Sequence, residues 1–416
     1  MAGQGIEAEI LQWVDQRRGQ VVDFARQLIA TPSENPPGDE QAMAKAVGDR
    51  LRELNCGSPR IASRVAHRPN LLSSVVAPHA GPTLLFSGHL DTKPKGRDED
   101  WLIPPFDPVI REGRLYGLGS SDMKSAIAAM TYAASAVGSV AGELGGELQL
   151  VFTADEEAGG AFGAKYLSEA GLLRADVALV GEPSGHLTNW EYLDVVSRGE
   201  TCFRLRVRGT QMHSSISNMI PSVNANLRLA AVLLRLERDL KVHHEPHPFC
   251  PNGITVTPGV MMHGGIYYGI LPGEAECSTE IRVIPGMSFD GVRRDVEAFV
   301  EMLRHEDPDL RIELEFEAPP LDWIAPVEFP TSHPFLEALE TAAQRVLGFR
   351  PTKGAFPAWT DARFFRDIAG IPSIPAFGPG LLTVTHRPNE HVATDAIIEA
   401  AKIYALAAVL FLQTEH

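Results

Sequence analysis

Short apolar runs that end in polar residues alternate with helical segments, and this alternation constrains the fold more than any other feature. The apolar runs that predict buried strands lie at 83–87, 148–153 and 177–180. Apolar residues at helical spacing predict helices over 6–29, 41–54, 125–137, 334–347 and 393–412. Strands that alternate with helices are typical of an α/β domain with a mostly parallel sheet, whose ligands bind at the carboxyl ends of the strands.

The pattern changes near residue 195. Segment 201–208 alternates polar and apolar residues, which predicts a strand with one solvated face. The segments that follow predict the order helix, strand, strand, helix and strand, as in a small α+β sandwich. We therefore expect one discontinuous domain, formed by 1–194 and 319–416, and an inserted domain at 195–318.

Composition excludes several classes of protein. Lys and Arg number 37 against 53 Asp and Glu, a formal charge of −16, which argues against nucleic-acid binding because that affinity depends on phosphate neutralisation. No run of about 18 apolar residues occurs, so we expect no membrane span. Four widely spaced cysteines and no visible signal peptide predict a cytoplasmic protein with reduced thiols.

Side chains of the types that bind metals follow the predicted strands. In chain order, the candidates are His89, Asp91, Asp122, Glu156, Glu157, Glu182 and His386. Each has an ordinary alternative when it is considered alone. The glycine-rich turn at Asp122 also fits a helix N-cap, and the adjacent carboxylates of Glu156 and Glu157 also fit a solvated loop.

The ordered set resembles the family of co-catalytic zinc amidohydrolases that includes acetylornithine deacetylase, succinyl-diaminopimelate desuccinylase, aminoacylase and glutamate carboxypeptidase. The resemblance covers nearly the whole chain. It implies a mostly parallel-sheet zinc-peptidase catalytic domain with an inserted α+β sandwich that serves as lid and dimerisation domain. It also implies five metal ligands, which are His89, Asp122, Glu157, Glu182 and His386.

The resemblance assigns further roles around these ligands. Asp122 would bridge two metal ions, and its peptide bond to Met123 would be cis. Glu156 would be the general base, and Asp91 would orient His89 by accepting its second ring N–H. The implied reaction is hydrolysis of the amide bond of an N-acyl amino acid or related small carboxylate by a metal-bound hydroxide.

The charges of this set support a pair of divalent cations. Two such ions carry four positive charges, which three carboxylates and one hydroxide neutralise, so the cluster tolerates a partly buried cleft. The mixture of nitrogen and oxygen donors favours zinc, with cobalt or manganese as alternatives.

The inserted domain and the C-terminal part carry the remaining assignments. The segment around His213 resembles the family's lid motif, in which a histidine stabilises the oxyanion in the active site of a partner subunit, so we expect a homodimer. Arg282 would bind the substrate carboxylate, and Asp361, Arg363 and Gly378 would complete the substrate site. The alternatives are a loop histidine without a role and a strand-surface salt bridge.

Three positions depart from the family pattern. Gly269 stands where asparagine is usual, Trp359 where small residues are usual, and Lys93 where an apolar residue is common. None is a metal ligand, so the departures predict a reshaped substrate pocket. Alternatives to N-acyl amino acid hydrolysis are a metallo-dipeptidase or carboxypeptidase, a hydrolase of a non-peptide C–N bond on an aromatic acid, and a binding protein on an inactive fold.

Overall fold

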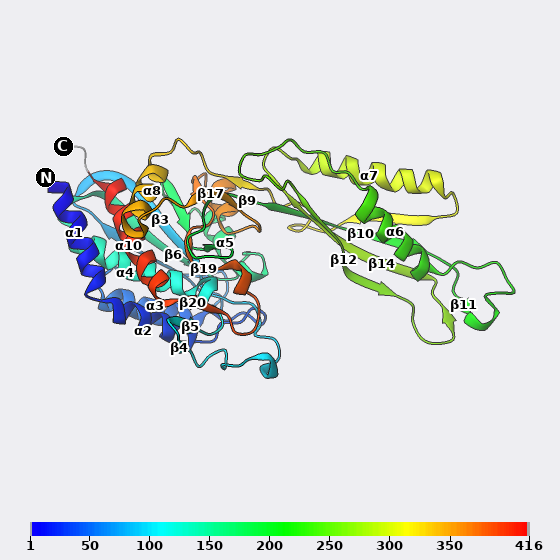
Figure 1. Cartoon of the computed structure of the whole chain (residues 1–416), viewed down its shortest axis with the longest axis horizontal. Coiled ribbons are helices and arrows are strands. Elements are labelled where there is room, and N and C mark those ends of the chain that lie inside the picture. The colour runs from blue at the N-terminus through cyan, green and yellow to red at the C-terminus, as the bar shows by residue number, and fades with distance from the viewer. Residues whose placement is uncertain (1, 414–416) are drawn as a thin grey trace. The chain divides into compact units, whose positions relative to one another are not determined.

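The computed structural model describes residues 2–413, which form two compact units (Figure 1). The first unit contains the chain through Ser197, Val327–Phe356 and the residues from Thr360. The second unit contains Arg198–Pro326 and the short segment Pro357–Trp359. Among the described residues, none of the helices combines the length and the apolar character that crossing a bilayer requires.

A six-stranded mixed sheet forms the centre of the first unit. Its strands, in spatial order, are β1 (Arg60–Ala62), β2 (Asn70–Val76), β6 (Gly145–Thr153), β3 (His79–His89), β7 (Val177–Val180) and β18 (Ser373–Ile374). Strands β6, β3, β7 and β18 are parallel, whereas β2 is antiparallel to both β1 and β6. Only residues 63–69 join β1 to β2, too few for the crossover that a parallel pair needs.

The parallel strands place their carboxyl ends at one edge of this sheet. His89 in β3 pairs with Thr153 in β6, and Ser87 in β3 pairs with Val180 in β7. Residues that follow the three strands therefore leave the sheet at the same edge. This arrangement brings segments that are distant in sequence to one place.

Helices cover both faces of the sheet. On one face lie α4 (Ser125–Ser139) and α10 (Thr394–Leu412), which are apolar and buried around most of their circumference. Around them pack α1 (Ala2–Asp15), α2 (Arg18–Ile29), α3 (Gln41–Glu53) and α8 (Pro334–Leu347). The other face packs against α5 (Ala164–Glu169) and α9 (Ala362–Asp367). The single helix predicted over 6–29 is wrong, because the chain leaves helical geometry at Arg17.

Short strands complete the first unit. They are β4 (Val109–Arg111), β5 (Arg114–Tyr116), β8 (Pro183–Gly185), β9 (Tyr192–Ser197), β16 (Val327–Glu328), β17 (Thr352–Phe356), β19 (Gly378–Leu381) and β20 (His391–Ala393). Strand β8 follows soon after β7 in the chain, and β19 pairs with β8 in parallel. A side chain at Gly378 would lie 2.1 Å from the carbonyl oxygen of Gly181, so this approach of two backbones requires glycine.

The second unit is a four-stranded antiparallel sheet with two helices on one face (Figure 1). Its strands, in spatial order, are β12 (Thr255–Gly264), β14 (Glu274–Val283), β10 (Gly199–Arg208) and β15 (Arg311–Phe316), and its helices are α6 (Ala225–Asp239) and α7 (Phe289–Glu306). The alternation predicted over 201–208 is confirmed, since Phe203, Leu205 and Val207 are buried in the core that includes residues of both helices. A separate pair is formed by β11 (Met212–His213) and β13 (Ile270–Leu271).

Candidate metal centre

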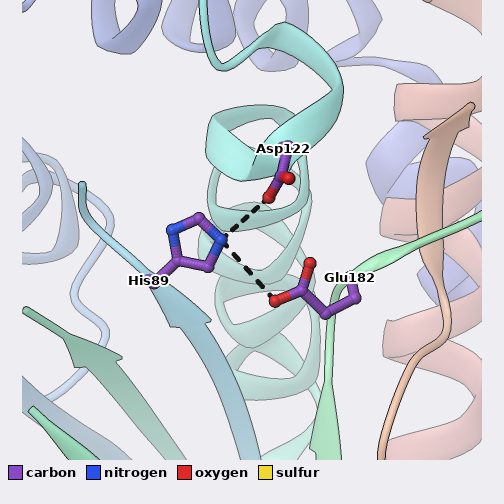
Figure 2. Close-up of side chains that lie close together, drawn as sticks. All are labelled: His89, Asp122 and Glu182. Atoms are coloured by element: carbon purple, nitrogen blue, oxygen red, sulfur yellow. Dashed lines mark hydrogen bonds and ion pairs between the residues drawn. The ribbon is translucent and has the colours of Figure 1, made fainter. Parts of the chain in front are cut away.

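The five predicted metal ligands form two groups that share Asp122. His89, Asp122 and Glu182 form the first group, and Asp122, Glu157 and His386 form the second. Within each group the ligand atoms lie within 4.8 Å of one another. Figure 2 shows the first group, with the ring of His89 facing both carboxylates. The structure thus brings together side chains that are spread over almost 300 residues of sequence.

The end of each strand explains where these side chains lie. His89 is the last residue of β3, Glu157 follows β6 in the 3₁₀ turn Glu156–Ala158, and Glu182 follows β7. Asp122 lies in the turn before α4, and its peptide bond to Met123 is cis, as predicted. Local sequence places these four residues at strand or helix ends, and the parallel sheet brings those ends together, whereas His386 comes from the loop before β20.

Asp122 has the geometry of a bridging ligand. Its Oδ1 lies 2.9 Å from Nε2 of His89, and its Oδ2 lies 3.1 Å from Nε2 of His386. Nε2 of His89 is also 3.6 Å from Oε1 of Glu182, and Nε2 of His386 is 3.3 Å from Oε1 of Glu157. Each carboxylate oxygen of Asp122 therefore faces a different histidine, as a residue shared between two cations requires.

The electrostatics of the cluster fit cations. Burial raises the pKa of Glu156 and of Glu182 well above the usual range. Neighbouring negative charges, Glu182 on Glu156 and Asp122 on Glu182, add to the rise, while His89 opposes it. Burial also acts to raise the pKa of Asp122, but hydrogen bonds from His386 and His89 outweigh it and lower that pKa. Buried carboxylates at this density need positive charge, and two divalent ions on the two groups would supply it.

Asp91 makes a different contact from the predicted one. The backbone carbonyl of Asp91, and not its carboxylate, lies 3.0 Å from Nδ1 of His89, while the nearest carboxylate oxygen is 3.7 Å away. The carboxylate instead accepts hydrogen bonds from the backbone N–H groups of Glu156, at 3.2 Å, and Glu157, at 3.1 Å. These N–H groups lie at the start of a turn, where no helical carbonyl accepts from them. The carboxylate of Asp91 therefore bonds to them and not to the ring of His89.

Glu390 holds the turn of Asp122, a role that the sequence analysis missed. Its buried carboxylate accepts hydrogen bonds from the N–H groups of Gly119, at 2.9 Å, Ser121, at 2.8 Å, and Asp122, at 3.0 Å. In the sequence, Glu390 is visible only as a charged residue four positions after His386. The tertiary structure is needed to show which backbone N–H groups its carboxylate accepts.

Lys93 lies beside the second group. Its backbone N–H donates to Oε1 of Glu157 at 3.1 Å, and its Nζ lies 3.2 Å from Oε2 of the same residue. The departure from the family pattern at position 93 therefore places an ammonium group next to one of the predicted ligands.

Three predicted substrate residues belong to the same unit as the cluster. Asp361 is buried, accepts a hydrogen bond from Oγ1 of Thr153 at 2.7 Å, and has its pKa raised by burial to about 6. Arg363 is buried and donates to the carbonyl of Gly159 at 3.0 Å. Gly378 packs on Gly181, next to Glu182. Burial of the side chains of Asp361 and Arg363 favours a role in shaping the site.

His213 and Arg282 belong to the second unit. His213 is exposed, and its Nδ1 lies 2.9 Å from Oγ of Ser215. The guanidinium of Arg282 lies 3.3 Å from Oε2 of Glu200 and also pairs with Glu280. Trp359 donates its indole N–H to the same oxygen of Glu200 at 2.9 Å. Arg282 and Trp359 thus share one carboxylate, a link that neither motif revealed.

Comparison with known proteins gives one family and one fold. Residues 85–409 match the family described as peptidase family M20/M25/M40. Succinyl-diaminopimelate desuccinylase of Methylobacillus flagellatus is 27% identical over 389 residues, which cover 92% of this chain and 97% of that protein. Human carnosine dipeptidase 1 has a similar structure, with a TM-score of 0.77, 17% identity and coverage of 98% of this chain and 99% of that chain.

A third relative is described as binding two metals. It is a dinuclear metal-binding peptidase of the M20 family from Bacillus subtilis, with a TM-score of 0.65 and 16% identity, and the match covers 96% of this chain and 100% of that chain. At these identities the solved structures establish the likeness of fold.

Proposed function

The chain belongs to peptidase family M20/M25/M40, and from this premise we propose that it is a metal-dependent hydrolase of the amide bond of an N-acyl amino acid or a related small carboxylate. The observation that carries the proposal is the pair of ligand groups that share Asp122 at the carboxyl ends of parallel strands. The desuccinylase from Methylobacillus flagellatus supports this substrate class, since its name describes removal of an acyl group from an amino acid.

The ligand set specifies what each group would hold. His89 and Glu182 would bind one cation, Glu157 and His386 the other, and Asp122 both. Two nitrogen and three carboxylate donors suit zinc, which we propose as the resident metal ahead of cobalt and manganese. Bound cations supply a polarised substrate carbonyl and a water whose pKa is lowered toward about 7.

Glu156 is the proposed general base. It is buried next to the ligand groups, and its backbone is fixed by Asp91. Burial raises the pKa of Glu156. Its carboxylate would accept a proton from the attacking water and return it to the leaving nitrogen. Asp91 and Glu390 keep the two ligand-bearing turns in place.

The test separates the base from the ligands. We expect Glu156→Gln to retain both metal ions and to lose about 100-fold or more in kcat, because a positioned general base contributes at least that much. Glu157→Gln, one residue further on, should lose metal as well as activity. Metal content by mass spectrometry and turnover of N-acetyl and N-succinyl amino acids are the measurements. Full activity of Glu156→Gln, or an absence of bound metal in the wild type, contradicts the proposal.

The substrate panel decides between the proposed activity and its neighbours. Dipeptides and anilides of aromatic acids belong beside the N-acyl amino acids in that panel. Faster turnover of dipeptides would show a dipeptidase. Faster turnover of the anilides would favour the alternative of an aromatic substrate, which Gly269 and Trp359 suggest.

The second unit is the proposed lid and dimerisation domain. We propose a homodimer in which His213 of each subunit stabilises the oxyanion in the active site of the other. Exposure of His213 at β11 supports a role outside the core of its own unit.

A further inference from the structure

We propose that Arg68 and Asn35 are positioning residues that orient the side chains of Glu156 and Glu157 by fixing the backbone of Asp155. The inference rests on the proposed function, because Glu156 and Glu157 matter here as base and metal ligand. It concerns a buried chain of hydrogen bonds that joins the loop after α2, the segment before β2 and the turn after β6.

Asp155 has a backbone conformation that needs support. Its φ is +68° and its ψ is 11°, the left-handed region that, apart from glycine, mainly asparagine and aspartate adopt. It directly precedes Glu156 and Glu157, so its backbone angles set the direction in which both side chains leave β6. Because such a conformation costs free energy, it persists only where surrounding contacts determine it.

Three donors hold the carboxylate of Asp155. Oδ1 accepts hydrogen bonds from Nη2 of Arg68 at 2.8 Å and from Nδ2 of Asn35 at 3.1 Å. Oδ2 accepts one from the backbone N–H of Phe162 at 3.1 Å. The carboxylate is thus fixed from both sides, and the left-handed turn is fixed with it.

Arg68 is itself held rigidly. Its guanidinium donates through Nε to Oε2 of Glu40 at 2.8 Å, and its Nη2 lies 2.8 Å from the other oxygen of Glu40. Both side chains are almost completely buried. A side chain at Gly38 would overlap the guanidinium, so the loop leaves this space for arginine. Arg68 thus donates through Nε to Glu40 and through Nη2 to Asp155, a two-point contact that a lysine cannot reproduce.

Asn35 joins Asp155 to the second carboxylate that controls the turn. Its Nδ2 donates to Oδ2 of Asp91 at 2.8 Å as well as to Asp155. The carboxylate of Asp91 in turn accepts the N–H groups of Glu156 and Glu157. One amide therefore ties together the two carboxylates that determine the conformation of the turn, and neither Asn35 nor Arg68 touches a ligand side chain in the contacts described.

The expected effect follows from this connectivity. Glu157 belongs to the second ligand group only, while His89 and Glu182 come from β3 and the end of β7. Loosening the turn should therefore weaken one metal-binding step and leave the other in place. Residues that orient metal ligands without touching the metal typically contribute about 10- to 100-fold in metal affinity or activity.

The test uses full-length variants and zinc itself. Arg68→Lys keeps the charge but loses the two-point contact, and Asn35→Asp keeps the size but removes the shared donor. Arg50→Lys is the matched control, because Arg50 lies in the same unit and contacts Tyr132 and Phe24 instead of the turn. Calorimetric zinc titration of the metal-free proteins, kcat and KM for an N-acyl amino acid, and thermal unfolding are the readouts.

We expect Arg68→Lys and Asn35→Asp to weaken one zinc-binding step by about 10-fold or more. In Arg68→Lys the other step should remain as in the wild type, and in both variants kcat should fall by a larger factor than KM changes. Two unchanged steps in both variants overturn the inference, and so does an equal loss in both steps that follows a lowered unfolding temperature. A wild type that binds no zinc refutes the proposed function, whereas a normal wild type with unaffected variants refutes only this inference.

Discussion

At the scale of single residues, the candidate metal centre contains carboxylates that hold backbone turns as well as the predicted ligands. Asp91 and Glu390 each accept hydrogen bonds from consecutive or near-consecutive N–H groups next to a predicted ligand. Such N–H groups lack helical partners, and a buried carboxylate satisfies two or three of them at once. The candidate ligands could therefore be predicted from the sequence, while the orientation of the turns that carry them depends on residues whose partners lie elsewhere in the chain.

Glu390→Gln tests this dependence. The two oxygens of the Glu390 carboxylate accept three N–H groups, whereas the amide of glutamine has only one acceptor oxygen. We therefore expect a loss of about 1–3 kcal/mol in the free energy of unfolding. Zinc affinity should fall as well, because the turn of Asp122 serves both ligand groups. Chemical denaturation and zinc titration measure the two effects. Wild-type values for both would show that Glu390 does not hold the turn.

At the scale of elements, prediction succeeded where the local signals were strong. Helix α8 begins at Pro334 and ends before Gly348, whose φ is +83°, and both bounds agree with the helix predicted over 334–347. Prediction was wrong over 6–29, where apolar spacing continues through the break between α1 and α2. The spacing of apolar residues shows which face of a helix is buried, but it does not show where one helix ends and the next begins.

Helix α8 also carries a pH dependence. Nδ1 of His333 accepts the N–H of Phe335 at 3.2 Å at the helix start, and burial lowers the pKa of His333. The unfolded chain therefore binds this proton more readily than the folded protein. The neutral ring of His333 therefore contributes fully to the free energy of unfolding above about pH 6.5. This contribution is lost as the pH falls through the pKa of His333 in the folded protein.

His333→Asn keeps an acceptor at this position without a titrating ring. We expect the free energy of unfolding of this variant to change less than that of the wild type between pH 7 and pH 5. Urea denaturation at a series of pH values measures the difference. Parallel pH profiles for the two proteins would refute the assignment.

At the scale of the whole molecule, the proposed active site needs two subunits. If His213 acts in the partner's site, a subunit with Glu156→Gln and a subunit with His213→Ala complement each other. Each mixed dimer then contains one complete site and one site that lacks both groups.

Mixing the two inactive variants should therefore restore activity. After random exchange of subunits we expect about a quarter of wild-type activity, because half of the dimers are mixed and each has one complete site. Light scattering checks the dimer, and each variant incubated alone is the control. No recovery in a mixture that has exchanged subunits would show that His213 has no role across the interface.

The amino-acid sequence was enough to predict the kinds of element, the residue types at the strand ends and the family. These follow from short-range periodicity and from motifs whose order survives at low identity. The three-dimensional contacts were needed to show that the carboxylate of Asp91 holds a turn instead of a histidine ring. They were also needed to show that Asn35 and Arg68 bind the carboxylate of Asp155, and that Glu390 accepts the N–H of Asp122. A hydrogen bond depends on distance in space, and these partners are separated by tens to hundreds of residues along the chain.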